Sequence, residues 1–343
     1  MEQVNNFVQI LTKLADAENL TAEEARAGMS EIMAGNVSPP GIASFLTALK
    51  MKGESAEEIT AFAGVMRENM VKVKPPEDCI DTCGTGGDGK GTFNVSTCAA
   101  FVAAGAWCIV AKHGNRAASG KCGSADVLEC LGVRMALNAE NAERQIACTG
   151  ITFMFAPAFH PAMKNVGPVR KELGFRTVFN ILGPLCNPAS VKRQVIGVAD
   201  AQSLEKVAGS LALLGPERAL VVSSETDEIG IGSDTIAIEV RGGKTNKSII
   251  RPEDFGLKRQ GIDALKVKDA DESAKIILGV LSGGKGPARD IVLLNAGAAI
   301  YVSGKALSVK DGVEMAKVSI DSGEALGKLE RLKSLGGYDG RHP

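Results

Sequence analysis

Hydrophobic residues recur at helical spacing near the start of the chain, and this pattern continues to about residue 70. One helical face is formed by Phe7, Ile10, Leu11 and Leu14. Thr21 and Ser55 are each followed three residues later by glutamate, which is the capping box that begins a helix. Ser38, followed by a proline, is a third helix start. The segment 1–72 is therefore predicted to be helical, and Lys72–Pro76 to be a linker.

The pattern changes after the linker, where short apolar runs bounded by glycine and polar residues alternate with helical stretches. Buried strands are predicted at Cys79–Asp81, Cys108–Ala111, Gln194–Val198 and Leu220–Val222. Helices are predicted between them, at Ser96–Ala106 and Ala201–Leu214. Such alternation is typical of an α/β domain with a largely parallel sheet. A further helical and basic stretch, His160–Gly174, could pack back against the N-terminal helices.

Composition narrows the classes of function. The 343 residues carry 39 basic and 40 acidic side chains, a net charge of -1, and only 4% are aromatic. A nucleic-acid-binding protein typically shows a basic excess and aromatic platforms, so we expect no nucleic-acid partner. The N-terminus lacks a signal-peptide pattern, and no apolar run reaches the length of a membrane span. We therefore expect a cytoplasmic protein without a membrane partner.

The eight cysteines form no Cys-x-x-Cys pair and have no histidine near them in sequence, which argues against a zinc site. We expect them to be reduced and mostly buried. The 40 glycines are more informative, because glycines serve tight turns and close approach of the backbone to ligands.

A glycine-rich stretch directly follows the first predicted strand. After Asp81 the chain runs through Gly84-Thr-Gly-Gly-Asp88 and Thr92 to Asn94-Val-Ser-Thr97, which opens a helix. Glycines allow backbone amides to surround an anion, and a helix N-terminus favours phosphate. The spacing is neither the dinucleotide fingerprint nor the Walker pattern. We predict a phosphate-binding loop, with a plain strand–turn–helix connection as the alternative.

A second polar cluster follows the next predicted strand, as Lys112-His-Gly-Asn-Arg116 and Gly123-Ser-Ala-Asp126. Both clusters are expected at the carboxyl ends of adjacent parallel strands, where open α/β sheets bind ligands. Lys112 could hold a phosphate as a point charge, and Asn115 and Ser119 could bind polar edges of a substrate. The alternatives are a solvated loop for Lys112 and Arg116, and a core position for His113.

A third cluster, Ser224–Glu228, follows the strand at 220–222 and contains adjacent carboxylates. Taken alone, such carboxylates are usually exposed to solvent. Placed at the same sheet edge as an anionic ligand, they need a cation between them. Magnesium held by one or two carboxylates together with substrate phosphates fits this requirement.

Together with Phe175–Pro184, these motifs closely resemble the anthranilate phosphoribosyltransferase family. The likeness spans nearly the whole chain and includes the ending Asp321–Ala325. The resemblance implies a glycosyltransferase (pentosyltransferase) of tryptophan biosynthesis that transfers phosphoribosyl from phosphoribosyl pyrophosphate to the amine of anthranilate. It also implies a homodimer that uses Mg²⁺, with two ions per subunit.

The resemblance implies a small N-terminal helical domain and a larger α/β domain with a mostly parallel central sheet. We expect the helical domain to comprise 1–72, joined by about 161–180. The ranges 73–160 and 181–335 are expected to form the domain that binds phosphoribosyl pyrophosphate.

The family's site residues can be carried over to matching positions. Phosphoribosyl pyrophosphate should be bound by Gly84, Gly87, Asp88, Thr92, Asn94, Val95, Ser96, Thr97, Lys112, His113, Gly114, Asn115, Arg116, Ala117, Ala118, Ser119, Gly120 and Ser124. Anthranilate should be bound by Gly84, Asn115, His160 and Arg170, the last lying ten residues after His160. The magnesium ligands should be Ser96, Asp227 and Glu228.

The sequence departs from the family's pattern in three places. Ser119-Gly120 stands where paired serines are usual, and Cys122 stands where a serine is usual. Ser223-Ser224 replaces a usual His-Gly, and the loop to Asp227 is about two residues shorter. This last departure weakens the assignment of Asp227 and Glu228.

The resemblance also suggests a mechanism. Breaking the bond from the anomeric carbon to pyrophosphate should pass through an oxocarbenium-like transition state. Lys112, the glycine-loop amides and magnesium would stabilise charge growing on pyrophosphate. An aromatic amine can attack while neutral and lose its proton afterwards, so no catalytic base is assigned. Arg170 suits the anthranilate carboxylate because its planar fork can bind both oxygens.

Two other functions share parts of this pattern. Pyrimidine nucleoside phosphorylases have the same fold and very similar Lys-His-Gly-Asn and Gly-Ser-Ala-Asp patterns, but they are longer and their glycine loop differs. A non-enzymatic relative that binds nucleic acid would be expected to have a basic face and a degraded first loop. Here the loop is intact and the net charge is close to zero.

Overall fold

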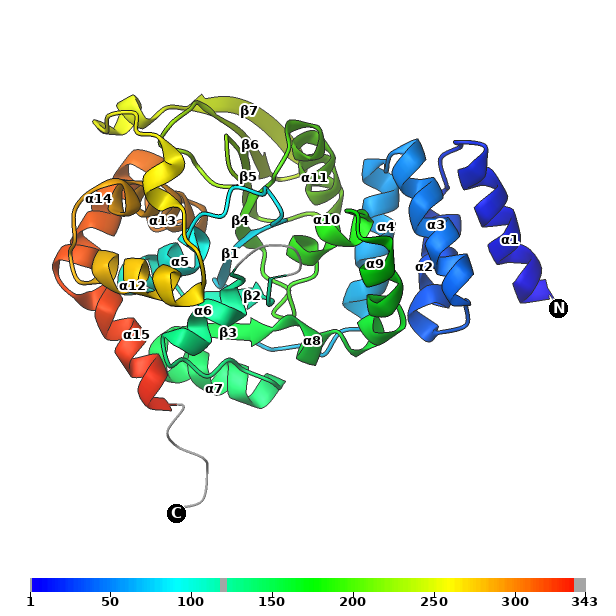
Figure 1. Cartoon of the computed structure of the whole chain (residues 1–343), viewed down its shortest axis with the longest axis horizontal. Helices are drawn as coiled ribbons and strands as arrows, with labels where there is room; N and C mark the ends of the chain where they lie inside the picture. The colour runs from blue at the N-terminus through cyan, green and yellow to red at the C-terminus, as the bar shows by residue number, and fades with distance from the viewer. Residues whose placement is uncertain (1, 118–121, 336–343) are drawn as a thin grey trace, which may run out of the picture.

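The computed structural model describes residues 2–117 and 122–335, with side chains from residue 6 onward. Within these ranges, an N-terminal helical bundle lies beside a seven-stranded sheet that is covered by helices (Figure 1). The bundle begins with α1 (Glu2–Ala15), α2 (Ala22–Ala34), α3 (Pro39–Lys52) and α4 (Ala56–Glu68). The predicted helical character of this part of the chain is confirmed.

The capping signals in the bundle form the bonds expected from the sequence. The amide of Thr21 donates to Glu24 at 2.9 Å, and the amide of Glu24 donates back to the Thr21 hydroxyl at 3.2 Å. Ser55 and Glu58 form the same reciprocal pair. Glu58 is fully buried, and its charge is met by Lys52 at 2.8 Å. These local bonds fix where α2 and α4 begin.

The sheet has the order β3-β2-β1-β4-β5-β6-β7. Its parallel strands are β1 (Ile80–Gly84), β2 (Val110–Gly114), β3 (Ile151–Phe155), β4 (Arg193–Gly197) and β5 (Arg218–Ser223). The antiparallel edge is formed by β6 (Thr235–Arg241) and β7 (Lys244–Ile250). The α/β class with a mostly parallel sheet is thus confirmed, whereas β3, β6 and β7 were not predicted from the sequence.

The predicted strands match β1, β2, β4 and β5 with shifted ends. The start of β2 is shifted, because this strand begins at Val110 rather than Cys108. The amide of Cys108 instead donates to the carbonyl of Ala103 at 3.1 Å, and so closes the end of α5 (Val95–Gly105). Trp107 between them adopts a positive φ of 65°. The apolar run that was predicted as a strand therefore begins in the turn that ends α5, and β2 starts only after this turn.

Alternate residues of the central strands face different cores. In β4, Val195 belongs to the hydrophobic cluster that contains α5, whereas Ile196 belongs to the cluster that contains the N-terminal bundle. The first face is covered by α5 and α13 (Pro287–Ser303). The second face is covered by α11 (Ala201–Leu214), which also packs on α4. The bundle and the sheet thus share one apolar core.

The basic stretch at 160–174 packs against the N-terminal bundle, as expected. It is broken into η1 (Pro161–Asn165) and α9 (Gly167–Leu173), because prolines occupy the first turn of each. The segment η1 packs on α2, α9 packs on α3, and α10 (Val178–Leu185) packs on α3 and α4. In Figure 1, α9 lies among the bundle helices, far along the sequence from them.

The remaining helices complete the α/β part. They are α6 (Ser124–Cys130), α7 (Ala139–Thr149), α8 (Ala156–Phe159), η2 (Pro252–Phe255), η3 (Ile262–Leu265), α12 (Ala270–Leu281), α14 (Val309–Asp321) and α15 (Glu324–Leu335). Across the described ranges, no helix is both long and apolar enough to cross a membrane. The eight cysteines are free, and five of them are buried.

Candidate active site

The three predicted polar clusters meet at one edge of the sheet. The glycine loop follows β1, the Lys112 cluster ends β2, and the acidic cluster follows β5, so all three lie at carboxyl ends of parallel strands. The chain leaves β1 toward β2 on one side and leaves β4 toward β5 on the other. Neighbouring strands β1 and β4 thus form the topological switch point, where open α/β sheets bind ligands.

Several residues of the glycine loop have positive φ angles, which residues with a side chain rarely adopt. Gly86, Gly87, Gly89 and Gly91 have φ values of 62°, 73°, 71° and 69°. A β-carbon on Gly86, Gly89 or Gly91 would meet no atom within 4 Å, so these glycines are required by conformation rather than by space. The side chain of Asp88 accepts from the amide of Lys90 at 3.0 Å. Its other oxygen, Oδ2, is buried without a hydrogen-bond partner among the described residues.

Asp227 and Glu228 are partly buried, which overturns the reading of their loop as merely solvent-exposed. Burial, together with the negative charge of Asp88, raises the pKa of Asp227 to about 6. Burial and the charge of Asp227 raise the pKa of Glu228 well above its usual value. Asp227 Oδ2 accepts from the amide of Gly86 at 3.1 Å. The two carboxylates therefore face the glycine loop with too little positive charge around them.

Glycines allow the Asp227 loop to approach the strand ends. A β-carbon on Gly197, the last residue of β4, would overlap the carbonyl oxygen of Asp227. A β-carbon on Gly84, the last residue of β1, would lie 2.9 Å from Asp227 Oδ2. Both contacts are shorter than real β-carbons make. Backbone packing at the switch point therefore fixes where the Asp227 carboxylate lies.

The N-terminus of α5 joins the acidic pair to Lys112. The amide of Ser96 donates to Glu228 Oε1 at 3.2 Å, and Lys112 Nζ lies 3.2 Å from Ser96 Oγ. Lys112 Nζ also donates to the carbonyl of Thr82, and the residue is only 3% exposed. The solvated-loop reading of Lys112 is thus wrong. A small cavity beside this cluster is lined by Thr82, Cys83, Ser96, Ala99, Val195, Glu228 and Asn295.

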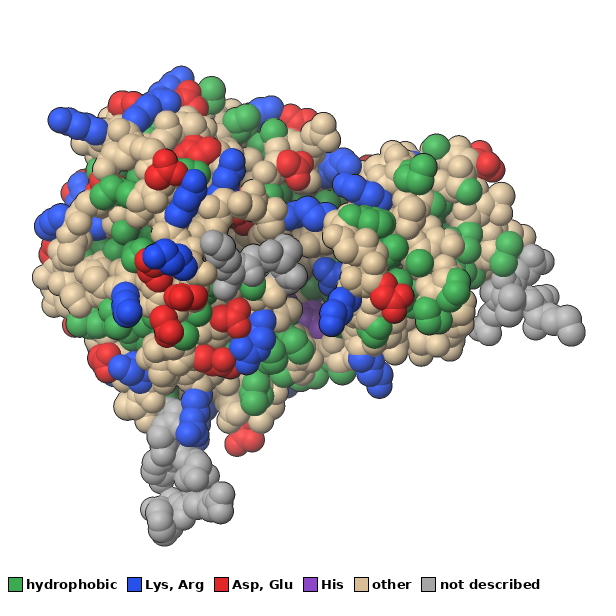
Figure 2. Space-filling model, in the orientation of Figure 1, with side chains coloured by type: hydrophobic (Ala, Val, Ile, Leu, Met, Phe, Trp, Pro, Cys, Tyr) green, Lys and Arg blue, Asp and Glu red, His purple; other side chains and the backbone are tan. Residues whose placement is uncertain are grey.

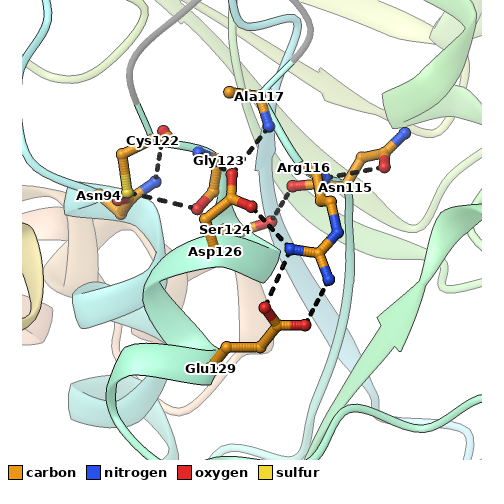
Figure 3. A network of polar contacts seen from close by, with 9 residues as sticks. All are labelled: Asn94, Asn115, Arg116, Ala117, Cys122, Gly123, Ser124, Asp126 and Glu129. Atoms are coloured by element: carbon orange, nitrogen blue, oxygen red, sulfur yellow. Dashed lines mark hydrogen bonds and ion pairs between the residues drawn. The ribbon is translucent and has the colours of Figure 1, made fainter. Parts of the chain in front are cut away.

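The Lys112 cluster and the start of α6 are tied together by one network of bonds (Figure 3). Asp126 Oδ2 accepts from the amides of Ala117 and Gly123 at 3.0 and 2.9 Å. Arg116 pairs with Asp126 and Glu129, and Ser124 Oγ donates to the carbonyl of Asn115 at 3.2 Å. The carboxylate of Asp126 thus holds the turn whose polar groups were predicted to line the substrate. The Arg116 side chain is half exposed, as its solvated-loop alternative expected.

Asn94 is linked across the site to a residue that departs from the family's pattern. Its Oδ1 accepts from Cys122 Sγ at 2.9 Å, and its Nδ2 donates to the carbonyl of Cys122 at 3.3 Å (Figure 3). The same Oδ1 accepts from Ser273 Oγ at 2.8 Å. Burial raises the pKa of the Cys122 thiol to about 11, so it remains a neutral donor. Cysteine therefore performs the hydrogen-bonding role that a serine could perform here.

Two histidines, buried His160 and partly buried His113, lie beside each other near the bundle. The rings of His113 and His160 are 5.0 Å apart, and burial lowers the pKa of His113 to about 3. Burial also lowers the pKa of His160. Among the described residues, Nε2 of each ring is buried without a partner. Both imidazoles are therefore neutral at physiological pH, and the core alternative for His113 agrees with this environment.

Arg170 lies on α9, on the bundle side of the molecule. Its guanidinium lies over the ring of Phe179, 5.3 Å from the centroid, and burial lowers its pKa. In Figure 2, Lys and Arg side chains gather along the hollow between the bundle and the α/β part, and a histidine is visible at its base. Arg170 lies on α9, which packs on α3 of the bundle, and His160 directly precedes η1, which packs on α2.

Other predicted residues differ in what they offer a ligand. Val95 and Thr97 are buried with 2% and 0% exposure, and among the described residues Thr97 Oγ1 has no hydrogen-bond partner. Thr92 forms an isolated bridge with Lys266, and Gly114 ends β2. Ala118, Ser119 and Gly120 lie outside the described residues.

Sequence reasoning missed Asn187 and Arg176, which organise the site. Buried Asp81 accepts from Asn187 Nδ2 at 2.7 Å, and burial raises its pKa. Asn187 also donates to the carbonyl of Ala111 at 2.8 Å, so it ties β1 to β2. Arg176 donates to the carbonyl of Gly86 in the glycine loop. The only sequence signal for Arg176 was its place within the Phe175–Pro184 motif, which carries no information about its partner.

Two family models match the chain. Residues 8–70 match the helical bundle domain of a glycosyl transferase family, and residues 76–326 match the a/b domain of a glycosyl transferase family. Both matches agree with the bundle, the sheet and the anion-binding edge described above. The fold and the site thus define a glycosyl transferase.

Similar proteins narrow this class. The chain is 52% identical to an anthranilate phosphoribosyltransferase of Rubrobacter xylanophilus over 94% of its length and 96% of the relative's. It superimposes on the enzyme of that name from Thermus thermophilus with a TM-score of 0.88 and 45% identity, covering 95% and 98% of the two chains. The Saccharomyces cerevisiae enzyme in complex with phosphoribosyl pyrophosphate and Mg gives a TM-score of 0.88 with 30% identity over 96% and 97%. This chain belongs to the anthranilate phosphoribosyltransferase family.

Proposed function

We propose that this chain transfers the phosphoribosyl group of phosphoribosyl pyrophosphate to the amine of anthranilate and releases pyrophosphate, a step of tryptophan biosynthesis. The observation that carries the proposal is the meeting of the glycine loop with the carboxylate pair Asp227 and Glu228 at the switch point. This arrangement occurs in a chain about half identical to relatives named for this activity over nearly their whole length.

The donor would bind at the ends of β1, β2 and β5. Amides of the glycine loop and of the first turn of α5 would receive its phosphates, supported by the dipole of that helix. Asn94, Ser96 and Lys112 would contribute side chains, since their contacts place them around one helix N-terminus. Asn115, Arg116 and Ser124 would border the same donor from the network held by Asp126.

Magnesium fits the residues present. Asp227 and Glu228 are partly buried carboxylates with raised pKa values, and Asp88 Oδ2 is buried without a partner among the described residues. Such groups are stabilised by a divalent cation, and magnesium prefers oxygen ligands supplied partly by substrate phosphates. Among the described residues, no cluster of three or more His, Cys, Asp or Glu could hold a metal alone. We propose two ions per subunit, bound by Asp227, Glu228 and Ser96 together with the donor.

Anthranilate would bind at the hollow between the bundle and the sheet. Arg170 would pair with its carboxylate, which would compensate for the solvation that burial takes from the guanidinium. Neutral His160 and the backbone of Gly84 would border the ring and amine, and Asn115 would bind a polar edge. The Saccharomyces cerevisiae enzyme has been solved with 4-fluoroanthranilate, as a variant 29% identical to this chain.

In the reaction, the amine nitrogen forms a bond to the anomeric carbon while the bond from that carbon to the pyrophosphate oxygen breaks. The bonding pair leaves with pyrophosphate, and one proton of the resulting secondary ammonium passes to solvent to leave the secondary amine. Lys112 and the loop amides stabilise the charge that grows on the leaving oxygen. When bound, magnesium supplies Lewis-acid stabilisation of the same charge. The remaining acceleration comes from positioning of the two reactants.

Further expectations accompany this function. We propose a homodimer with a cytoplasmic location, as the family resemblance suggests. We also propose the domain division 1–72 with about 161–180 against 73–160 with 181–335, which the packing of α9 on α3 supports. Sedimentation of the purified protein at micromolar concentration would check the dimer.

Anthranilate fluorescence provides the test. With phosphoribosyl pyrophosphate and magnesium, the emission of anthranilate should fall while one pyrophosphate is released for each anthranilate consumed. Omission of either the donor or magnesium should abolish the change. Phosphate-dependent cleavage of thymidine, assayed with the same preparation, should be absent. Thymidine cleavage without anthranilate consumption would overturn the proposal in favour of a nucleoside phosphorylase.

A further inference from the structure

The glycine loop contacts a segment that is distant in the sequence. Arg176 lies in the connection between α9 and α10, and its guanidinium donates to the carbonyl of Gly86, 90 residues away. Arg176 follows Arg170, the proposed anthranilate ligand, by six positions in the sequence. A single side chain therefore joins the acceptor side of the site to the donor side.

The peptide groups of Gly86 are held from both sides by charged partners. Asp227 accepts from its amide at 3.1 Å, and Arg176 donates to its carbonyl. Hydrogen bonds to charged groups are stronger than those between neutral groups. Two such bonds on one residue keep a chain with positive φ in a single conformation.

Gly87 is the glycine of the loop whose side-chain space is taken by Arg176. A β-carbon on Gly87 would overlap the guanidinium, whereas one on Gly86, Gly89 or Gly91 would meet nothing within 4 Å. The packing of Arg176 against the loop is thus close enough to exclude a methyl group. The position of the Arg176 guanidinium therefore depends on residue 87 having no side chain.

The charge of Arg176 also acts on the acidic pair. Burial and Asp88 raise the pKa of Asp227, and Arg176 is among the groups that counteract this rise. Were the Asp227 carboxylate to hold magnesium, its hydrogen bond from the Gly86 amide would be weakened by competition. Arg176 then remains as the charged partner that still holds the loop.

We propose that Arg176 is a positioning residue that holds the glycine loop in its donor-binding conformation and ties that loop to the segment carrying Arg170. The proposal rests on the proposed function in naming phosphoribosyl pyrophosphate as the loop's ligand. Its consequence is that loss of Arg176 weakens donor binding far more than it changes the chemical step. Arg176 acts through the backbone of Gly86 and needs no contact with the reacting atoms.

The first test needs no ligand. In hydrogen exchange of the free protein, peptides covering 80–93 should exchange about tenfold faster in Arg176→Ala than in wild type, because one charged bond to the loop is lost. Arg218→Ala is the matched control, since Arg218 donates to the carbonyl of Tyr301 at 3.1 Å from the opposite end of β5. It should leave exchange of 80–93 unchanged. Unaltered exchange in Arg176→Ala would overturn the proposal whatever the enzyme's substrates are.

The second test measures donor binding. Arg176→Ala should raise the Kd and KM for phosphoribosyl pyrophosphate with magnesium about tenfold or more, while kcat changes less than about threefold. Arg176→Lys, which keeps a donor, should recover part of the affinity. A fall in kcat at unchanged KM would overturn the positioning role. Wild-type turnover of anthranilate decides the proposed function separately, so failure of either claim can be recognised.

A double-mutant cycle tests the shared arrangement directly. Gly87→Ala alone should weaken donor binding strongly, because the methyl group displaces Arg176 and the positive φ of 73° is strained. In the Arg176→Ala background the same change should cost much less, because only the strain remains. Additive effects of the two substitutions would contradict the proposal.

Discussion

The donor side and the acceptor side of the site differ in how their buried polar groups are balanced. On the donor side, Asp227 and Glu228 are partly buried carboxylates whose pKa values are raised, so their ionised forms lack sufficient positive charge nearby. On the acceptor side, His160 is buried as a neutral ring, and the neutral ring of His113 lies 5.0 Å from it. The first environment requires a cation to become fully charged, whereas the second is already suited to a neutral aromatic amine.

The donor half of the site is therefore incomplete without its ligands, whereas the acceptor half is largely preformed. A metal and a polyanionic donor would complete the carboxylate half, because each supplies what the other lacks. The histidine half needs only one charged contact, from Arg170 to the acceptor's carboxylate. Substitutions in the two halves are therefore expected to change different observables.

The largest effect is expected from Asp227→Asn. Asparagine keeps the shape and can still accept from the amide of Gly86, but it removes a magnesium ligand charge. We expect kcat/KM for the donor to fall about 1000-fold, with a shifted magnesium dependence in the fluorescence assay. Asp263→Asn is the control, because that carboxylate is exposed and pairs with Lys266. An unchanged magnesium dependence of Asp227→Asn would mean that the metal assignment is wrong.

Gly197→Ala tests whether backbone packing places the carboxylate pair. The added β-carbon would overlap the carbonyl of Asp227, so the protein should lose about 3 kcal/mol of unfolding free energy and most of its activity. The matched control is Gly279→Ala in α12, where a β-carbon meets nothing within 4 Å. That variant should be as stable as wild type or slightly more stable. Equal urea denaturation curves for the two variants would refute the packing argument.

Arg170→Ala tests the acceptor half. The variant should raise the KM for anthranilate about 50-fold, because one charged pair with the substrate is lost, and it should leave the Kd for the donor unchanged. Arg170→Lys should recover only part of the affinity, since lysine lacks the planar fork. Lys171→Ala, on the same helix and exposed, serves as the control. Steady-state kinetics that show an unchanged KM for anthranilate would remove Arg170 from the acceptor site.

His113→Asn tests the neutral state of the histidine pair that borders the acceptor half through its pH dependence. The folded pKa of His113 is lowered to about 3, so its stabilising contribution is present above about pH 6.5 and is lost as the pH falls toward 3. Between about pH 7.5 and pH 5, wild type should therefore lose about 2 kcal/mol that the variant does not lose. Urea denaturation at both pH values measures this difference. Parallel losses in the two proteins would mean that His113 is not buried as a neutral ring.

The sequence predicted the fold where its signals are local. Capping boxes at Thr21 and Ser55 and apolar runs near 80 and 195 required no information from elsewhere in the chain. The antiparallel edge was missed because β7 is polar and exposed over most of its length and carries no buried face. The shifted start of β2 was missed because the apolar run continued from the end of α5.

The site was predictable in its motifs but not in its contacts. The glycine loop and the Lys112 cluster could be identified because strand ends of a parallel sheet share an edge. Burial of Asp227 and Glu228 could not, because it depends on glycines 84 and 197 leaving space at a switch point formed by distant strands. The contact of Arg176 with Gly86 depends on how the bundle meets the sheet, which no local pattern encodes.

The most direct test of the difference between the two halves is a crystal structure of the protein with phosphoribosyl pyrophosphate and Mn²⁺ in place of Mg²⁺. The anomalous signal of manganese in that crystal locates the metal. We predict signal within about 2.3 Å of carboxylate oxygens of Asp227 and Glu228, with the pyrophosphate at the glycine loop. Manganese bound elsewhere, with both carboxylates still facing only protein, would contradict the claim that the donor half is completed by a cation.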